Sequence, residues 1–150
     1  MGVARLRAFL GKHRRIALDT SIFIYHLEAN PAWSELAGEV FSWLEHSRNT
    51  AVTSTLTMTE LLIHPYRAGN EQLVNRYFAL LSLFPNLEWI APDLHIADAA
   101  ARIRAQHRIR TPDSLQIATA VSAGASALLS NDLGLLRIDG IEVAILGRFR

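Results

Sequence analysis

Four acidic residues in this 150-residue chain, Asp19, Glu60, Asp113 and Asp132, lie where carboxylates could do chemistry. Asp19 and Asp132 each come just after a short apolar run, whereas Glu60 and Asp113 fall in stretches with helical spacing. Clustered carboxylates repel one another unless a cation lies among them. If the fold brings the four together, we expect them to bind Mg²⁺ or Mn²⁺, which favour oxygen ligands.

Such an ion, alone or as a pair about 4 Å apart, can activate water and stabilise charge on a phosphodiester during in-line displacement. Attack by metal-activated water predicts 5′-phosphate and 3′-hydroxyl ends and makes no use of an RNA 2′-hydroxyl. Thr20, Ser21 and Asn131 are short polar neighbours that could orient the acids or a bound water. Arg108 and Arg110 lie close enough to the site in sequence to hold an RNA backbone.

Each acid by itself also has an ordinary explanation, because acids are common at helix starts and after strands. The helix that carries Asp113 has a marked start, with Thr111 predicted as its N-cap and Pro112 as its first residue. That places Asp113 in the first turn, where the free backbone N–H groups favour a carboxylate. The functional prediction therefore rests on the four acids together and on the elements that position them.

Short apolar runs and helical spacing alternate along the chain. Strands are predicted at 16–18, 51–53, 87–90 and 126–129, with an edge strand at 141–146. Helices are predicted at 22–27, 32–46, 56–64, 70–84, 93–107 and 112–123, with Pro65 ending the third of them.

This alternation predicts one α/β domain over residues 1–150, a central parallel sheet of four to five strands with helices on both faces. In such sheets, ligands bind beyond the carboxyl ends of the strands, where the strand order reverses. If the first and fourth strands are central neighbours, all four acids can converge there.

The amino-acid composition excludes several kinds of functional site. The chain has no cysteine, which excludes disulfides, thiolate zinc sites and thiol catalysis. Its six histidines show no metal-ligand spacing, and its formal charge is only +1. Lys12 is the only lysine, so the other basic side chains are arginines, which suit phosphate contacts. We find no signal-peptide pattern in residues 1–15 and no apolar run that could cross a membrane, so a cytoplasmic protein is expected.

The acidic motifs resemble those of the PIN-domain nucleases, and most of all the VapC-type toxins of bacterial toxin–antitoxin modules. The resemblance covers about residues 15–146 and rests on Leu18-Asp19-Thr20-Ser21, Thr59-Glu60-Leu61, Pro112-Asp113-Ser114-Leu115-Gln116-Ile117-Ala118 and Ser130-Asn131-Asp132. It implies a metal-dependent endoribonuclease that forms a homodimer, with the four acids at the family's acidic positions. It also implies a cognate VapB-like antitoxin, which would place a basic side chain in the acidic site.

Three positions depart from the family pattern. Gly134 and Leu135 stand where some relatives carry a further acid and an aromatic residue, and Gln116 stands near where some add a carboxylate. We therefore expect one tightly bound metal ion and a second that is recruited only with substrate.

Two other functions remain open. A PIN-like RNA-binding module without catalysis would bind RNA in EDTA and after Asp113→Asn. A maturation or DNA-repair nuclease on the same scaffold would lack an adjacent antitoxin gene and would not arrest growth. Phosphoaspartate enzymes are disfavoured, because Ser21 stands where their second Asp is needed and the downstream lysine is missing.

Overall fold

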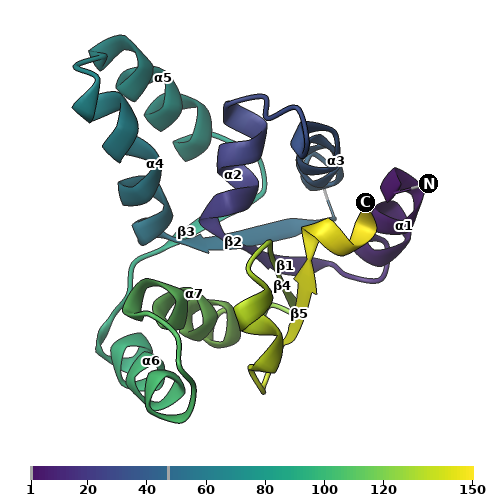
Figure 1. Cartoon of the computed structure of the whole chain (residues 1–150), viewed down its shortest axis with the longest axis vertical. Helices are drawn as coiled ribbons and strands as arrows, with labels where there is room; N and C mark the ends of the chain where they lie inside the picture. Colours follow the sequence, from purple (N-terminus) through teal and green to yellow (C-terminus); the bar gives the residue numbers. More distant parts are fainter. Residues whose placement is uncertain (1, 47) are drawn as a thin grey trace.

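The centre of the computed structural model, which describes residues 2–46 and 48–150, is a five-stranded sheet in the order β3-β2-β1-β4-β5 (Figure 1). The strands are β1 (Arg15–Leu18), β2 (Thr50–Ser54), β3 (Leu87–Ile90), β4 (Ala127–Ser130) and β5 (Glu142–Ile145). Every pairing is parallel, and β1 lies between β2 and β4. The strand order therefore reverses between β1 and β4, which confirms the predicted α/β fold and makes the first and fourth strands central neighbours.

Helices cover both faces of this sheet (Figure 1). They are α1 (Gly2–Leu10), α2 (Thr20–Leu27), α3 (Ser34–Leu44), α4 (Thr55–Arg67), α5 (Glu71–Ser82), α6 (Leu94–Gln106) and α7 (Thr111–Ser122), with short 3₁₀ helices η1 (Leu133–Arg137) and η2 (Leu146–Phe149). The first five α-helices lie on one side of the sheet, and α6 and α7 lie on the other (Figure 1). In the described part of the chain, no helix has the length and apolar character needed to span a bilayer.

The sheet is apolar on both faces, which explains why its strands read as uninterrupted apolar runs. Successive side chains of a strand point to opposite faces. Ile16 and Leu18 of β1 accordingly pack in the core beneath α1, α2 and α3, whereas Ala17 packs with Ile117 of α7 on the other face. Leu128 on β4 belongs to this second core. Burial on both sides holds the carboxyl ends of β1 and β4 rigidly next to each other.

The end predicted for the helix that carries Glu60 is wrong. Helix α4 runs through Pro65 and continues to Arg67. A proline lacks only its own N–H bond to the carbonyl one turn earlier, so in the last turn it removes little of the hydrogen-bond ladder. The helix ends instead before Gly69, whose φ of +64° is a left-handed conformation that glycine adopts without strain.

The start predicted for the helix that carries Asp113 is also wrong, by one residue. Arg110 is the N-cap of α7 and makes no side-chain capping bond, while Thr111 is already helical. The Thr111 hydroxyl accepts a hydrogen bond from Arg104 on α6, so this contact between helices replaces the predicted cap. Asp113 nevertheless remains in the first turn, as expected.

Three elements were not predicted from the sequence: α1 and the 3₁₀ helices η1 and η2. Helix α1 occupies most of the basic N-terminal segment and buries Leu6 and Leu10 in the core. Two buried residues in nine give too weak a periodicity to identify a helix. The 3₁₀ helix η1 begins directly after Asp132, which is its N-cap.

Candidate functional site

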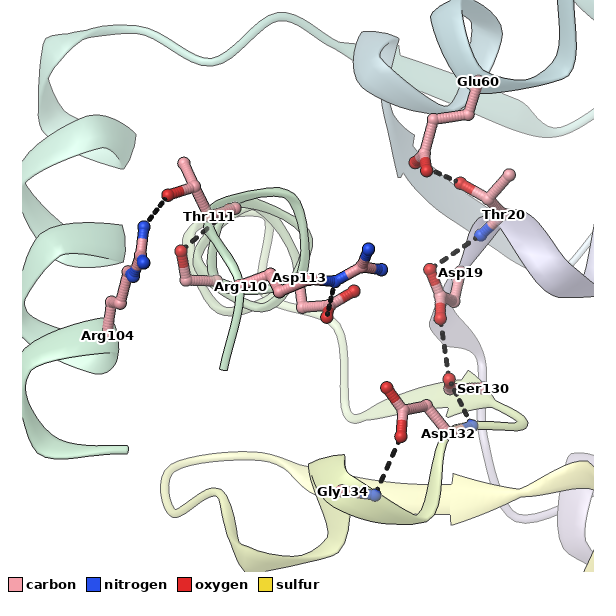
Figure 2. Close-up of polar contacts among 11 residues, drawn as sticks. Asp19, Thr20, Glu60, Arg104, Arg110, Thr111, Asp113, Ser130, Asp132 and Gly134 are labelled. Atoms are coloured by element: carbon pink, nitrogen blue, oxygen red, sulfur yellow. Dashed lines mark hydrogen bonds and ion pairs between the residues drawn. The ribbon is translucent and has the colours of Figure 1, made fainter. Parts of the chain in front are cut away.

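The four acids line one cavity of about 260 Å³ beyond the ends of β1 and β4 (Figure 2). Asp19 is the N-cap of α2, Glu60 lies within α4, Asp113 lies in the first turn of α7, and Asp132 is the N-cap of η1. Four separate elements therefore deliver one carboxylate each, and three of these carboxylates sit at helix starts, where free N–H groups stabilise them.

Asp19 is held by two hydrogen bonds. Its Oδ1 accepts from the backbone N–H of Thr20 at 2.8 Å, and its Oδ2 accepts from the Ser130 hydroxyl at 2.7 Å. Burial raises the pKa of Asp19, and the charges of Glu60 and Asp132 raise it further, although the two hydrogen bonds partly oppose this. A cation among the acids would relieve this penalty.

Glu60 is connected to Asp19 through a single residue. The Thr20 hydroxyl donates to Glu60 Oε1 at 2.8 Å, while the backbone N–H of Thr20 donates to Asp19 (Figure 2). Thr20, which was predicted from the sequence to orient the acids, thus contacts two of them.

Ser130 connects Asp19 to Asp132 in the same way. Its hydroxyl donates to Asp19 and accepts from the backbone N–H of Asp132 at 3.1 Å. Asp132 Oδ1 also accepts from the N–H of Gly134 at 2.9 Å, which turns this carboxylate back over η1. Ser130 belongs to the last acidic motif in the sequence, but no role was predicted for it. The available signal was a hydroxyl residue at the last position of a buried strand, two residues before an acid.

Asp113 has a basic neighbour. Arg110 Nε lies 3.7 Å from Asp113 Oδ2; the Asp113 side chain is 16% exposed and that of Arg110 is 80% exposed. Burial raises the pKa of Asp113, the charges of Asp19 and Asp132 add to this, and Arg110 opposes it. The guanidinium of Arg110 lies beside Asp113 on the side toward Asp19, and it lines the same cavity (Figure 2).

Ser21 and Asn131, the other predicted polar neighbours, also line the cavity. The Ser21 hydroxyl is buried and has no hydrogen-bond partner in the described chain. Asn131 donates to the Tyr25 hydroxyl at 3.0 Å and accepts from the N–H of Gly147 at 2.8 Å, so its amide joins α2 to η2. Of the two, Ser21 is therefore the one whose polar side-chain atom is left without a partner in the described chain.

The donor set fits Mg²⁺ or Mn²⁺ in its chemistry, because four carboxylates that repel one another line the cavity. Its present geometry is less complete. Across residues 2–46 and 48–150, no three acid or histidine side chains are grouped closely enough to hold a metal ion. Two of the acids have other partners here: Arg110 lies beside Asp113, and the N–H of Gly134 binds Asp132.

A basic groove of about 600 Å³ adjoins the acids. Its walls include the predicted Arg108 and Arg110, together with Asp113 and Asp132. The other lining residues are Arg104, His107, Ile109 and Gly134, of which Arg104 and His107 were not predicted. Arg104 lies on α6, and the other basic residues of the groove lie in the α6–α7 connection, so basic side chains and two of the acids line the same groove.

Residues 16–141 match the PIN domain family, a span that contains all four acids. The chain belongs to the PIN-domain family. No curated protein sequence matches it.

Solved structures with the same fold include toxin–antitoxin complexes. A chain of the DNA-bound VapBC from Salmonella typhimurium is 26% identical, with a TM-score of 0.65, and the match covers 88% of this PIN domain chain and 98% of that one. VapBC-1 from nontypeable Haemophilus influenzae gives 22% identity and a TM-score of 0.69, covering 89% and 98%. VapBC2 from Rickettsia felis, bound to a promoter DNA fragment, gives 20% identity and a TM-score of 0.67, covering 87% and 98%.

The positions at which this PIN domain departs from the family pattern have local roles. Gly134 supplies the N–H that binds Asp132, and Leu135 is buried in the core against α7. Gln116 is buried and donates to the Thr57 hydroxyl at 2.7 Å. None of the three brings a further carboxylate to the cavity.

Proposed function

We propose that this PIN domain is a Mg²⁺- or Mn²⁺-dependent endoribonuclease and acts as a VapC-type toxin. One observation carries the proposal: carboxylates from four separate elements line one cavity, and that cavity adjoins a groove with three arginines and a histidine. The acids suit a divalent cation and the groove suits a phosphate backbone. A site for a small neutral ligand would need neither.

The proposed roles follow from the contacts. Asp19, Asp113 and Asp132 hold the cation, while Glu60 ligates through water or helps to activate the nucleophile. When bound, the cation supplies activation of water and stabilisation of charge on the phosphodiester. Arg108 holds the RNA backbone in the groove. Arg110, which lies beside Asp113 and also lines the groove, would bind a phosphate of the same backbone.

The proposed partner is a VapB-like antitoxin. The similar chains from Salmonella typhimurium and Haemophilus influenzae belong to VapBC structures. In this chain an apolar groove of about 800 Å³ runs between α4 and α5, and Thr59 lines it while the next residue, Glu60, lines the acid cavity. A protein segment in that groove could therefore reach the acids with a basic side chain. By the same family resemblance, we propose that the chain forms a homodimer, which light scattering of the purified protein would test.

The proposed activity is tested by titrating Mn²⁺ calorimetrically into wild-type, Asp113→Asn and Asp98→Asn proteins, with RNA cleavage measured on the same samples. Asp98 is the matched control, since it is 65% exposed and pairs with Arg102 at 3.1 Å on α6. We expect Asp113→Asn to lose metal binding and at least 100-fold in cleavage, and Asp98→Asn to retain both.

The outcomes separate the alternatives. Cleavage should give 5′-phosphate ends and survive a 2′-deoxy substitution at the scissile nucleotide. RNA binding that persists in EDTA, without cleavage by the wild type, would instead support a binding module. Growth arrest on expression, reversed by the product of an adjacent small gene, would distinguish a toxin from a processing nuclease.

A further inference from the structure

Beneath the acids lies a chain of buried polar side chains from four elements. Thr20 of α2, Thr53 of β2, Thr57 of α4 and Gln116 of α7 are each at most 6% exposed. Polar side chains this deeply buried are costly unless each finds a partner. Here they bond to one another, and one end of the chain reaches Glu60.

The contacts set the direction of the hydrogen bonds around Thr57. Thr53 donates its only hydroxyl proton to the carbonyl of Leu18 at 2.9 Å, because a carbonyl can only accept. The Thr57 hydroxyl, 2.7 Å from that of Thr53, must therefore be the donor between the two. Gln116 Nε2 donates to Thr57 at 2.7 Å. The proton of Thr57 is thus committed away from Thr20.

Because its proton goes to Thr53, the Thr57 hydroxyl can only accept a hydrogen bond from Thr20. Its hydroxyl lies 2.8 Å from Glu60 Oε1 and 3.3 Å from Thr57 Oγ1. Since Thr57 has no proton to offer, the Thr20 proton can go to either acceptor, and the shorter, charge-assisted bond to the carboxylate is the stronger. Thr20 is therefore the donor to Glu60, and Thr57 is a second, more distant acceptor for the same hydroxyl.

Thr57 and Gln116 each lie about one helical turn from one of the acids. Thr57 precedes Glu60 by three residues on α4, and Gln116 follows Asp113 by three residues on α7. Residues three apart share a helix face. The Thr57–Gln116 bond therefore joins the two helices one turn away from their carboxylates. The backbone nitrogen of Ser54 lies 3.5 Å from Gln116 Oε1. This contact fixes which end of the Gln116 side-chain amide is the oxygen and which is the nitrogen.

We propose that Thr57 is a positioning residue: through its bond to Gln116 it sets the spacing between Glu60 on α4 and Asp113 on α7. The proposal rests on the proposed nuclease function only for its kinetic readout. Among the described residues Thr57 makes no hydrogen bond to an acid, so it acts through Gln116 and through the helix that it shares with Glu60.

The test compares Thr57→Val, which removes the hydroxyl at nearly constant shape, with Thr57→Ser, which restores it. Thr119→Val is the matched control: Thr119 is 1% exposed, and its hydroxyl donates only to the Leu115 carbonyl of its own helix. A Thr57→Val/Gln116→Leu double variant protects against misfolding, because removing both partners leaves no unpaired buried amide.

We expect Thr57→Val and the double variant to lose about tenfold or more in kcat, with KM within about threefold of wild type. Thr57→Ser should restore kcat, and Thr119→Val should leave it unchanged even if it lowers the melting temperature equally. Wild-type kcat in the double variant, or equal losses in Thr57→Val and Thr119→Val, would overturn the proposal.

A second readout needs neither metal nor RNA. In metal-free protein we expect Thr57→Val to shift the NMR signal of the Glu60 carboxyl carbon, and Thr57→Ser and Thr119→Val to leave it in place. An unmoved signal in Thr57→Val would overturn the inference. A wild type that neither binds Mn²⁺ nor cleaves RNA would instead overturn the proposed function, with this readout still deciding the role of Thr57.

Discussion

Thr20 binds Glu60 and Asp19 at once: its hydroxyl is 2.8 Å from Glu60 Oε1, and its backbone nitrogen is 2.8 Å from Asp19 Oδ1. The backbone bond is available to any residue except proline, whereas the hydroxyl bond needs Thr or Ser. The contact to Glu60 can therefore be removed while the contact to Asp19 is kept.

Thr20→Val should reduce RNA cleavage by about 10- to 100-fold, because a hydrogen bond to a charged group contributes about 1.5–3 kcal/mol. Thr20→Ser keeps the hydroxyl and should stay within a few-fold of wild type. Single-turnover cleavage measures both. Equal activity of the Val and Ser variants would mean that the bond to Glu60 does not matter for cleavage.

Ser130→Ala should destabilise the protein by about 1–3 kcal/mol, because it removes a donor from the buried Asp19 and an acceptor from the N–H of Asp132. Urea denaturation in EDTA measures this. Ser82→Ala is the control, since Ser82 makes a long 3.4 Å bond to the carbonyl of Ala79 in its own helix. A Ser130→Ala variant no less stable than the control would contradict the bridging role.

The raised pKa of Asp113 predicts a pH-dependent stability difference in metal-free protein. The folded state holds the proton more tightly than the unfolded chain, so this group's contribution to the free energy of unfolding falls as pH rises from about 4 through the raised value. An asparagine does not titrate, so Asp113→Asn does not lose this contribution. The melting temperature of Asp113→Asn minus that of wild type should therefore increase with pH, by about 2–4 °C for each 1 kcal/mol of unfolding free energy that wild type loses.

Thermal denaturation in EDTA at a series of pH values measures that difference. Saturating Mn²⁺ should reverse the order at neutral pH, because a cation stabilises only the protein that binds it. If the melting temperature of Asp113→Asn in EDTA fell relative to that of wild type as pH rises, the prediction would be contradicted.

Arg108→Gln/Arg110→Gln should weaken the binding of a single-stranded RNA to the inactive Asp19→Asn protein. If each arginine neutralises one phosphate, the slope of log K against log salt should become shallower by about 1.4. Fluorescence anisotropy over a range of salt concentrations measures the slope. Arg102→Gln is the control, because Arg102 pairs with Asp98 on α6. An unchanged slope in the double variant would exclude these arginines from RNA contact.

Much of the fold was predictable because its signals are local. Short apolar runs identify β1 to β5, and a left-handed Gly124 ends α7 where the sequence suggested. The positions of the four acids relative to these elements follow from the same patterns. Helix ends were less certain, since Pro65 and Thr111 each have more than one permitted position near a helix terminus.

The connections between acids came only from the tertiary structure. Ser130 is 111 residues from Asp19, and Gln116 is 59 residues from Thr57, yet each pair is hydrogen-bonded. No local pattern encodes such pairs, because the strand order decides which element ends are neighbours. By itself, the sequence determined which residues could do the chemistry and at which ends of the elements they lie. Only the pairing of β1 with β4, buried on both faces, decided that they meet and which hydroxyls hold them.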